Sequence, residues 1–267
     1  MDGPASVIDA RNVGVTFKVD GGHVEVVRDV SFRLYPGQTS ALVGDSGSGK
    51  SVTARAVMRL LSKRARVKDE TRINYGNRDM AYLSLNEMRR LRGNRISMIY
   101  QEPMSSLNPA YSVGAQICEV LMLHQKMNRK AATASAVQLL DEVRFPVPKS
   151  RVNRYPHLLS DGQRQRVMIA MALANRPDVL IADEPTSALD PSVQAQIIEL
   201  LRKLQREKGL SYLFISHDLK VARALCHRVM VMQNGKVVEQ GPVKDVPVDP
   251  QTDYTRRLVR AVFEIAT

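Results

Sequence analysis

A glycine-rich octapeptide, residues 44–51, constrains this chain more than any other feature of its sequence. The segment GDSGSGKS follows the apolar run 41–43 and leads into residues 52–58, which have a helical pattern. Glycines let backbone N–H groups turn inward around an anion, and a new helix adds free N–H groups and a positive dipole end. The order of strand, glycine-rich loop and helix therefore predicts a phosphate-binding loop in an α/β protein.

Two side chains of this loop have distinct chemistry. Lys50 can reach the terminal phosphates of a nucleotide, and the Ser51 hydroxyl can join a magnesium ion. The predicted nucleotide-binding residues of the loop are Gly44, Asp45, Ser46, Gly47, Ser48, Gly49, Lys50, Ser51 and Val52. The alternative is a chance glycine turn before a helix, which the spacing and the context both disfavour.

Size and charge narrow the class of protein. The 267 residues suit one large domain, or a domain with a subdomain, and 44% apolar residues suffice for a core. Thirty-nine basic residues against 27 acidic ones give a net charge of +12. This charge suits a nucleotide, a nucleic acid or an anionic membrane face, although a basic surface kept for solubility is also possible.

Neither a membrane span nor a disulfide is expected. No apolar stretch approaches the roughly 20 residues needed to cross a bilayer, and residues 1–4 do not resemble a signal peptide. Any membrane role should therefore come through a partner. Cys118 and Cys226 have no paired or metal-like spacing, so we expect both to be reduced and buried.

The pattern along the chain alternates between strands and helices. Strands are expected at 13–18, 23–27, 31–34, 39–43, 95–100, 178–182, 211–216, 229–233 and 236–238. Helices are expected at 49–64, over most of 103–151, and at 161–175, 191–208 and 219–228. This alternation predicts a parallel core sheet with an antiparallel part near the N-terminus, and Asn234-Gly235 predicts a tight hairpin.

Two further segments carry polar groups where an anion site could form. An apolar run ends at Asp183 and Glu184, and ligands of open α/β sheets bind beyond the carboxyl ends of strands. Asp183 could hold magnesium and Glu184 could polarise a water molecule, whereas alone the pair would suggest only a surface turn. Ser160 precedes a helix, so it is either an ordinary N-cap or part of a second phosphate-binding helix end.

These motifs occur in one order: the phosphate loop, LSDGQRQR at 159–166, LIADEPTSALD at 180–190 and FISHD at 214–218. Together they resemble the ATP-binding subunit of ATP-binding-cassette (ABC) transporters over residues 6–245. IYQEPMSSLNP at 99–109, the stretch 166–190 and DYTRRL at 253–258 are similar to the oligopeptide, dipeptide and nickel importers, and to microcin-peptide uptake ATPases.

The resemblance implies a P-loop NTPase fold and a domain plan. The expected fold has a parallel core sheet, an N-terminal antiparallel β subdomain and an inserted helical subdomain. The ATP-binding domain would span 1–245, with helices at about 103–173, and a short tail would span 246–267.

The resemblance also implies roles for individual residues. Phe17 would stack on adenine, unless it is simply a core strand residue, and His217 would contact the terminal phosphate. Glu184 would be the catalytic base, while Gln101 would reach both the attacking water and the magnesium held by Ser51 and Asp183. The signature residues Ser160, Asp161, Gly162 and Gln163 would contact ATP held by the opposite subunit. The dimer-interface residues would be Ser187, Ala188, Leu189 and Asp190.

The implied mechanism uses ATP and Mg2+ and needs two cassettes, as a homodimer or a heterodimer. Permease subunits and a solute-binding protein would complete an importer, with this chain on the cytoplasmic face of the cell (inner) membrane and no nucleic acid bound. Open alternatives are a soluble ABC ATPase of DNA repair or translation, a non-hydrolysing nucleotide-gated module and a weakly hydrolysing partner in a heterodimer.

One departure from the family pattern bears on these alternatives. Position 161 is aspartate, where the family usually has glycine. The carboxylate suits a helix N-terminus but would repel phosphate, and the residue would be strained if its φ were positive. We therefore expect Asp161→Gly to raise the ATPase activity of the assembled transporter.

Overall fold

The structure, a computed structural model, describes residues 5–263, and the chain divides into two compact units. The first unit is built from residues up to Met88 and from Gln205 onward, and the second is Arg89–Leu204. Residues 1–4, where a signal peptide was not expected, and residues 264–267 of the expected tail lie outside the described residues. The predicted domain limit at 245 stays a prediction.

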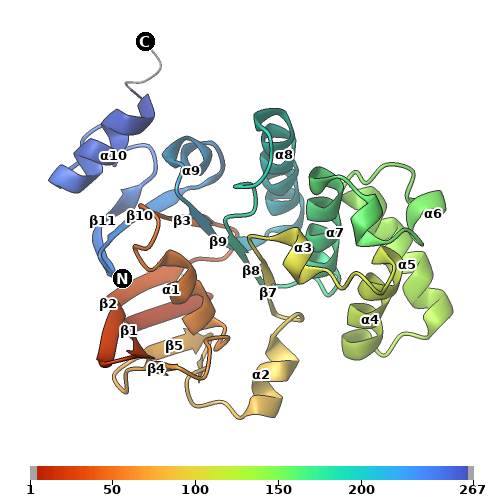
Figure 1. Cartoon of the computed structure of the whole chain (residues 1–267), viewed down its shortest axis with the longest axis horizontal. Coiled ribbons are helices and arrows are strands. Elements are labelled where there is room, and N and C mark those ends of the chain that lie inside the picture. The colour runs from red at the N-terminus through yellow and green to blue at the C-terminus, as the bar shows by residue number, and fades with distance from the viewer. Residues whose placement is uncertain (1–4, 264–267) are drawn as a thin grey trace. The chain divides into compact units, whose positions relative to one another are not determined.

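The first unit contains an antiparallel sheet, drawn in red to orange in Figure 1. Its strands are β1 (Ile8–Val19), β2 (Gly22–Leu34), β4 (Ala65–Val67), β5 (Arg72–Tyr75) and β6 (Arg78–Asp79). The two strands predicted at 23–27 and 31–34 form one strand, β2. Pairing with β1 continues across an irregularity in register, where Asp29 takes a φ of 54°. A bulge absorbs the extra residues without ending the strand.

The first unit also contains parallel strands that position the candidate site. Strands β9 (Ser211–Ser216) and β10 (Arg228–Gln233) flank β3 (Thr39–Val43), and β11 (Lys236–Pro242) pairs antiparallel with β10. All residues of β3 and β9 are buried. The loops that follow β3 and β9 therefore leave from the same edge, as in other parallel sheets.

Three helices complete the described part of the first unit. Helix α1 (Lys50–Val57) packs against β1 and β2, α9 (Leu219–Leu225) packs against β3 and β9, and α10 (Asp253–Phe263) packs against α9. The prediction that the first helix runs to residue 64 is wrong. The chain leaves the helix at Arg59, which has a φ of 50° and donates to the carbonyls of Met80 and Leu83.

The second unit pairs β7 (Ile96–Ile99) in parallel with β8 (Val179–Asp183) and is otherwise helical (Figure 1). Its helices are α3 (Pro103–Ser106), α4 (Val113–Gln125), α5 (Arg129–Glu142), α6 (Pro148–Arg151), a 3-10 turn (Pro156–Leu158) and α7 (Asp161–Leu173). Two more helices cross the unit boundaries, α2 (Leu85–Leu91) and α8 (Pro191–Lys208). Helices α4, α5 and α7 pack on one another around wholly buried apolar residues such as Ile117, Leu140 and Val167.

The fold class predicted from the sequence is confirmed. No helix among residues 5–263 is long and apolar enough to cross a membrane. Cys118 and Cys226 are free and buried. Burial raises the pKa of the Cys226 thiol far above its ordinary value.

Candidate functional site

The phosphate loop connects β3 to α1 in a conformation that requires glycine at two positions. Gly44 has a φ of 151°, and a Cβ atom there would lie 2.1 Å from the carbonyl oxygen of Met232. Gly49 has a φ of 105°, and a Cβ atom there would lie 2.9 Å from the carbonyl oxygen of Val26. Side chains at either position would force the loop away from these neighbours. The glycines at positions 44 and 49 are therefore required by the backbone conformation of the loop.

Lys50, the first residue of α1, is only 4% exposed. Its Nζ donates to the carbonyl oxygens of Gly44 and Asp45, at 2.8 Å each. The ammonium group therefore lies against the loop that it is expected to serve. A phosphate oxygen bound in the loop would offer it a charged acceptor in place of neutral carbonyls, and hydrogen bonds between charged groups are the stronger ones.

His217 leaves the sheet at the same edge as the phosphate loop. Val43, the last residue of β3, is aligned with Ser216, the last residue of β9. His217 follows and is exposed, while Asp218 accepts from the N–H of Lys220 at 2.7 Å and so caps α9. The first unit thus brings the loop and His217 to one side of its parallel strands.

The second unit brings together the other predicted catalytic residues. Ile99 at the end of β7 is aligned with Ala182 near the end of β8, so Gln101 and Glu184 follow neighbouring strands. Gln101 Nε2 donates to Glu184 Oε2 at 3.4 Å. Asp183, the last residue of β8, is fully buried. The side chains of Gln101 and Glu184 therefore meet, and Asp183 directly precedes Glu184 in the chain.

Glu184 has a left-handed backbone, with a φ of 45°. This conformation costs a residue with a Cβ atom about 1–3 kcal/mol and is often found at functional sites. Its carbonyl oxygen accepts from the backbone N–H of Ser187 at 3.3 Å and from the Ser187 hydroxyl at 3.1 Å. The tight turn sets the direction of the Glu184 side chain and starts the predicted interface segment.

The predicted interface segment, 187–190, is largely exposed and ends at a helix cap. Ser187, Ala188 and Asp190 are exposed. Asp190 Oδ1 accepts from the Ser192 hydroxyl at 2.7 Å and from the N–H of Val193 at 3.1 Å. These hydrogen bonds hold the pKa of the Asp190 carboxyl below its ordinary value, and the bond from the Ser192 hydroxyl has the largest effect. The segment is fixed at both ends while its middle faces outward.

Ser160 is the N-cap of α7, within a capping box. Its hydroxyl accepts from the N–H of Gln163 at 3.4 Å, and the Gln163 side chain accepts from the N–H of Ser160 at 3.4 Å. Ser160 is also exposed. Capping and presentation to a second molecule are therefore compatible, because the hydroxyl retains its own proton to donate.

Two contacts hold α7 against its neighbouring elements. A Cβ atom at Gly162 would lie 2.6 Å from a methyl carbon of Val193, so only glycine permits this approach. The guanidinium group of Arg166 donates to the carbonyl of Val143 at 2.8 Å and to the side chain of Gln196 at 3.1 Å. Arg166 thereby fixes α7 to the end of α5 and to α8, a role that the sequence did not indicate.

The structure corrects one concern about Asp161. This residue is the first of α7 and has a negative φ, so the backbone strain considered from the sequence is absent. Its carboxylate, on a side chain that is 62% exposed, lies 2.5 Å from Nη1 of Arg164. A cation three residues later thus partly offsets the negative charge of Asp161. An Asp and an Arg at that spacing on a helix are the sequence signal that could have predicted the pair.

Phe17 lies near the end of β1, opposite Val24 of β2 and Ala65 of β4. It is only half-buried, so its ring is not a core residue of the sheet. An aromatic ring that is accessible to solvent can stack on a base. The predicted contact with adenine is compatible with this position and stays a prediction.

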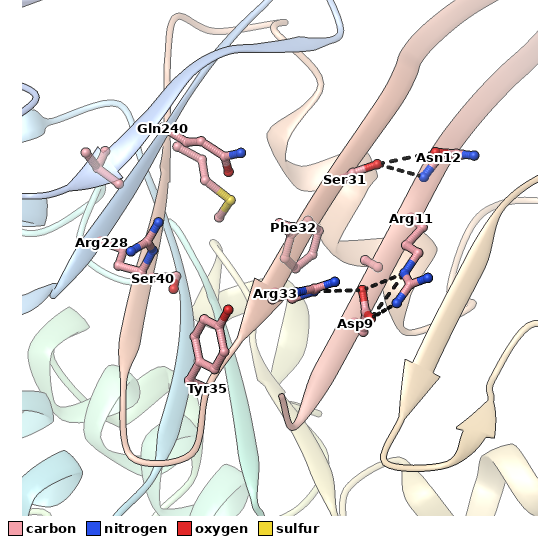
Figure 2. A pocket seen from close by; sticks show the side chains of 13 residues that line it. Asp9, Arg11, Asn12, Ser31, Phe32, Arg33, Tyr35, Ser40, Arg228 and Gln240 are labelled. Atoms are coloured by element: carbon pink, nitrogen blue, oxygen red, sulfur yellow. Dashed lines mark hydrogen bonds and ion pairs between the residues drawn. The ribbon is translucent and has the colours of Figure 1, made fainter. Parts of the chain in front are cut away.

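A separate cavity of about 520 Å³ lies in the first unit between the antiparallel sheet and strands β10 and β11 (Figure 2). The Asp9 carboxylate joins Arg11 at 2.6 Å and Arg33 at 3.6 Å in its wall. The Arg11 hydrogen bond is the main reason that the pKa of Asp9 is lowered. None of the predicted nucleotide-binding residues lines this cavity.

Comparisons with known proteins agree with these motifs. The family model described as ABC transporter matches residues 27–187. The oligopeptide transport ATP-binding protein OppD of Bacillus subtilis (strain 168) is 46% identical, over 96% of this chain and 72% of its own length. The peptidoglycan transport ATP-binding protein YejF of Agrobacterium fabrum (strain C58 / ATCC 33970) is 50% identical, over 96% of this chain and 47% of its own length.

A solved structure of another protein has a similar fold. It is the dimeric, post-hydrolysis structure of the ATP-binding cassette MJ0796 bound to ADP and Pi. The match has a TM-score of 0.79 and 27% sequence identity, and covers 88% of this chain and 98% of the other.

Proposed function

Because this chain belongs to the ABC transporter family and is an ATP-hydrolysing subunit of it, we propose that it powers the uptake of peptides or similar small solutes. OppD is named for oligopeptide transport and YejF for peptidoglycan transport. A peptide-containing cargo is common to both names. The cargo is proposed from these names, and the observation that carries the ATP-binding role is the buried Lys50 ammonium within a glycine-shaped phosphate loop.

We assign the binding of ATP phosphates to the first unit of the chain. The N–H groups of residues 47–52 and the dipole of α1 would hold the phosphates, and Lys50 would offset the charge that develops on the transferred group. His217 leaves the same sheet edge and would contact the terminal phosphate. Phe17 would stack on the adenine.

The donors predicted for magnesium fit that ion in kind. The Ser51 hydroxyl, the Asp183 carboxylate and the Gln101 amide all offer oxygen, which Mg2+ prefers. Asp183 is fully buried at the end of β8, where a cation would compensate its charge. Bound magnesium would draw electron density from the phosphate oxygens.

Hydrolysis itself would be assigned to Glu184. Its carboxylate would accept a proton from water as the water oxygen bonds to the terminal phosphorus, while the bond from that phosphorus to the bridging oxygen breaks. The products are ADP and inorganic phosphate. Gln101, which already donates to Glu184, would hold the carboxylate and the water in line.

We propose that a second cassette completes each site. Ser160, Gly162 and Gln163 would bind the ATP held by the partner, and residues 187–190 would line the interface. ATP then makes contacts that exist only in the closed pair, and such differential affinity can shift an open–closed equilibrium. Release of phosphate would let the pair separate.

The permease would dock on the second unit. Residues 102–109 are mostly exposed, and Met104 is 52% exposed. A groove of about 710 Å³ nearby in sequence is lined by Tyr111, Met122 and Leu123, all exposed. An apolar helix of the permease would cover these side chains, which would place the chain at the cytoplasmic face of the membrane. A solute-binding protein would deliver the cargo to the permease.

Phosphate release by the purified chain, measured against protein concentration, tests the two-cassette mechanism. We expect the rate per protomer to rise with concentration and to fall to background for Glu184→Gln. Recovery of permease subunits with the chain from solubilised membranes tests the transport role. A rate that is independent of concentration and insensitive to Glu184→Gln would contradict the mechanism.

A further inference from the structure

The phosphate loop is held from outside by residues that come about 190 to 210 positions later in the chain. The backbone N–H of Asp45 donates to the hydroxyl oxygen of Tyr254 at 2.9 Å, across 209 positions. The backbone N–H of Gly235 donates to the carbonyl oxygen of Ser48 at 3.0 Å. Both contacts lie within the first unit, one near each end of the loop. The loop is therefore not shaped by its glycines alone.

The Tyr254 contact falls on the same peptide group that holds Lys50. In a trans peptide the C=O and the N–H point in opposite directions. The carbonyl of the peptide between Gly44 and Asp45 accepts from Lys50 Nζ at 2.8 Å, and its N–H donates to Tyr254. Any rotation of this peptide that frees Tyr254 would also turn the carbonyl away from Lys50. Tyr254 thus fixes the plane of the group against which the lysine rests.

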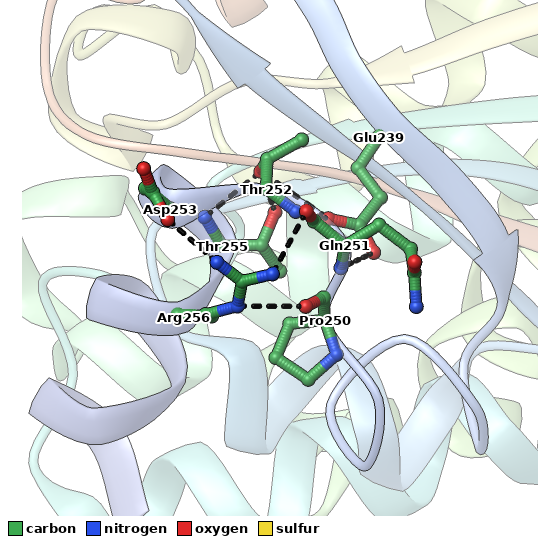
Figure 3. Close-up of polar contacts among 7 residues, drawn as sticks. All are labelled: Glu239, Pro250, Gln251, Thr252, Asp253, Thr255 and Arg256. Atoms are coloured by element: carbon green, nitrogen blue, oxygen red, sulfur yellow. Dashed lines mark hydrogen bonds and ion pairs between the residues drawn. The ribbon is translucent and has the colours of Figure 1, made fainter.

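Tyr254 belongs to α10, and the start of this helix is held by the polar contacts drawn in Figure 3. The Glu239 carboxylate of β11 accepts from the N–H of Gln251 at 2.9 Å and from the N–H and hydroxyl of Thr252 at 3.1 and 3.2 Å. Burial opposes ionisation, but hydrogen bonds from Thr255, Gln251 and Thr252 outweigh it and lower the pKa of Glu239. An ionised Glu239 therefore ties α10 to the sheet at neutral pH.

A second set of bonds stiffens the same turn. Arg256 donates to the carbonyls of Pro250 and Gln251 at 3.1 and 3.2 Å, and to Asp253 at 2.6 Å. Tyr254 is 7% exposed. Burial raises the pKa of its hydroxyl, which therefore stays protonated and neutral beside the loop at physiological pH. A side chain held this closely is costly to move.

We propose that Tyr254 is a positioning residue of the nucleotide site, through which α10 sets the phosphate loop in its ATP-binding shape. The inference rests on the proposed function, because it concerns the same loop and the same lysine. Loss of the hydroxyl leaves the Asp45 N–H without its acceptor and lets the peptide rotate. Pre-organisation of the loop is lost, and ATP binding has to restore it.

Tyr254→Phe tests the proposal, since it removes one oxygen and keeps the ring. Tyr82→Phe is the matched control, because Tyr82 is 70% exposed and the substitution keeps its ring over Arg72. We expect Tyr254→Phe to weaken ATP binding by about fivefold, the value of one ordinary hydrogen bond. KM should rise with little change in kcat, and the Asp45 amide should exchange its hydrogen faster.

Further variants separate the failure of this inference from the failure of the proposed function. Lys50→Ala without effect on ATP affinity would overturn the proposed function. If Lys50→Ala weakens ATP binding but Tyr254→Phe binds ATP like the Tyr82→Phe control, only the role of Tyr254 is refuted. Glu239→Gln, which loosens the anchor but retains the hydroxyl, should weaken ATP binding by a smaller factor. An unchanged affinity for both Tyr254→Phe and Glu239→Gln would exclude any contribution of α10.

Discussion

The predicted site residues of the first unit differ from those of the second unit in burial. In the first unit, Lys50 and Ser48 are 4% and 5% exposed, and the chain's own carbonyls and N–H groups hold the loop. In the second unit, Ser160 and Ser187 are exposed, and the Asp161 side chain is 62% exposed. The predicted phosphate-binding residues are thus held by their own chain, whereas the predicted signature and interface residues expose polar groups at the surface of the second unit.

Because of this difference in burial, we expect mutations in the two units to affect different quantities, either the ATP affinity of one chain or the ATP turnover of two. Substitutions in the buried loop should change how tightly one chain binds ATP. Substitutions at the exposed signature and interface residues should leave that affinity intact and change only what two chains do together. Mutations in the two units should therefore have distinguishable effects, with different readouts and different dependence on protein concentration.

Glu184→Gln should give the largest effect and test whether chemistry belongs to the second unit. We expect kcat to fall by about 100- to 10,000-fold, because a positioned general base contributes that much. ATP affinity should be retained, since the loop is untouched. Steady-state phosphate release and binding of a fluorescent ATP analogue measure the two quantities. A parallel loss of affinity would remove the distinction between the units.

Lys50→Ala should give the next largest effect and test the first unit. Hydrogen bonds to charged groups are worth about 1.5–3 kcal/mol, so ATP affinity of the single chain should fall by about 10- to 100-fold. Equilibrium binding at protein concentrations too low for dimers measures it. Val57→Ala, at the other end of the same helix, serves as a control for the stability of α1. An effect seen only at high protein concentration would contradict the assignment.

Ser160→Ala should distinguish most clearly between the ATP affinity of one chain and the turnover of two chains. Loss of the cap should cost about 1 kcal/mol of unfolding free energy, and ATP affinity of the single chain should not change. Turnover of the assembled pair should fall by about tenfold, as for a lost hydrogen bond to a charged phosphate. Ser112→Ala, which removes the cap of α4, is the control for stability alone. Equal turnover in the two variants would argue that Ser160 is only a cap.

Asp161→Gly should give the smallest effect. Turnover should rise, as the sequence predicts, because one negative charge is removed. The rise should be no more than about threefold, since Arg164 already offsets the carboxylate and interactions between exposed charges are weak. Arg164→Gln should lower turnover by exposing the Asp161 charge. Initial rates of phosphate release compare the two variants. Higher turnover in Arg164→Gln would show that the pair does not screen phosphate.

Local sequence signals predicted the motifs and most strands, because spacing and buried runs reflect backbone geometry. The strands 39–43 and 211–216 and the helix 191–208 agree with the structure residue for residue. The end of α1 was missed, since Arg59 leaves the helix through bonds to two carbonyls more than 20 positions away. The short elements β4, β5, β6 and α2 were missed because few residues carry their pattern.

The candidate site was predictable where its residues follow strands of a parallel sheet, because the carboxyl ends of parallel strands lie at one edge. The sequence predicted a parallel core sheet, and the structure shows that Val43 is aligned with Ser216 and Ile99 with Ala182. The contact between Asp45 and Tyr254 was not predictable, because it joins segments 209 positions apart. The tail motif DYTRRL was visible, but its spacing carries no information on what the tyrosine touches.

The hairpin turn at Asn234-Gly235 has a consequence for the chemical lifetime of the protein. Deamidation of an Asn-Gly pair requires the glycine nitrogen to attack the asparagine side chain. Here both residues have a positive φ, and the glycine N–H donates to the carbonyl of Ser48. Deamidation of Asn234 should therefore be slow while the Gly235 N–H is bonded to Ser48. It should become faster when the phosphate loop moves and breaks this hydrogen bond. Mass spectrometry of protein stored with and without ATP would detect the difference, and equal rates would disprove it.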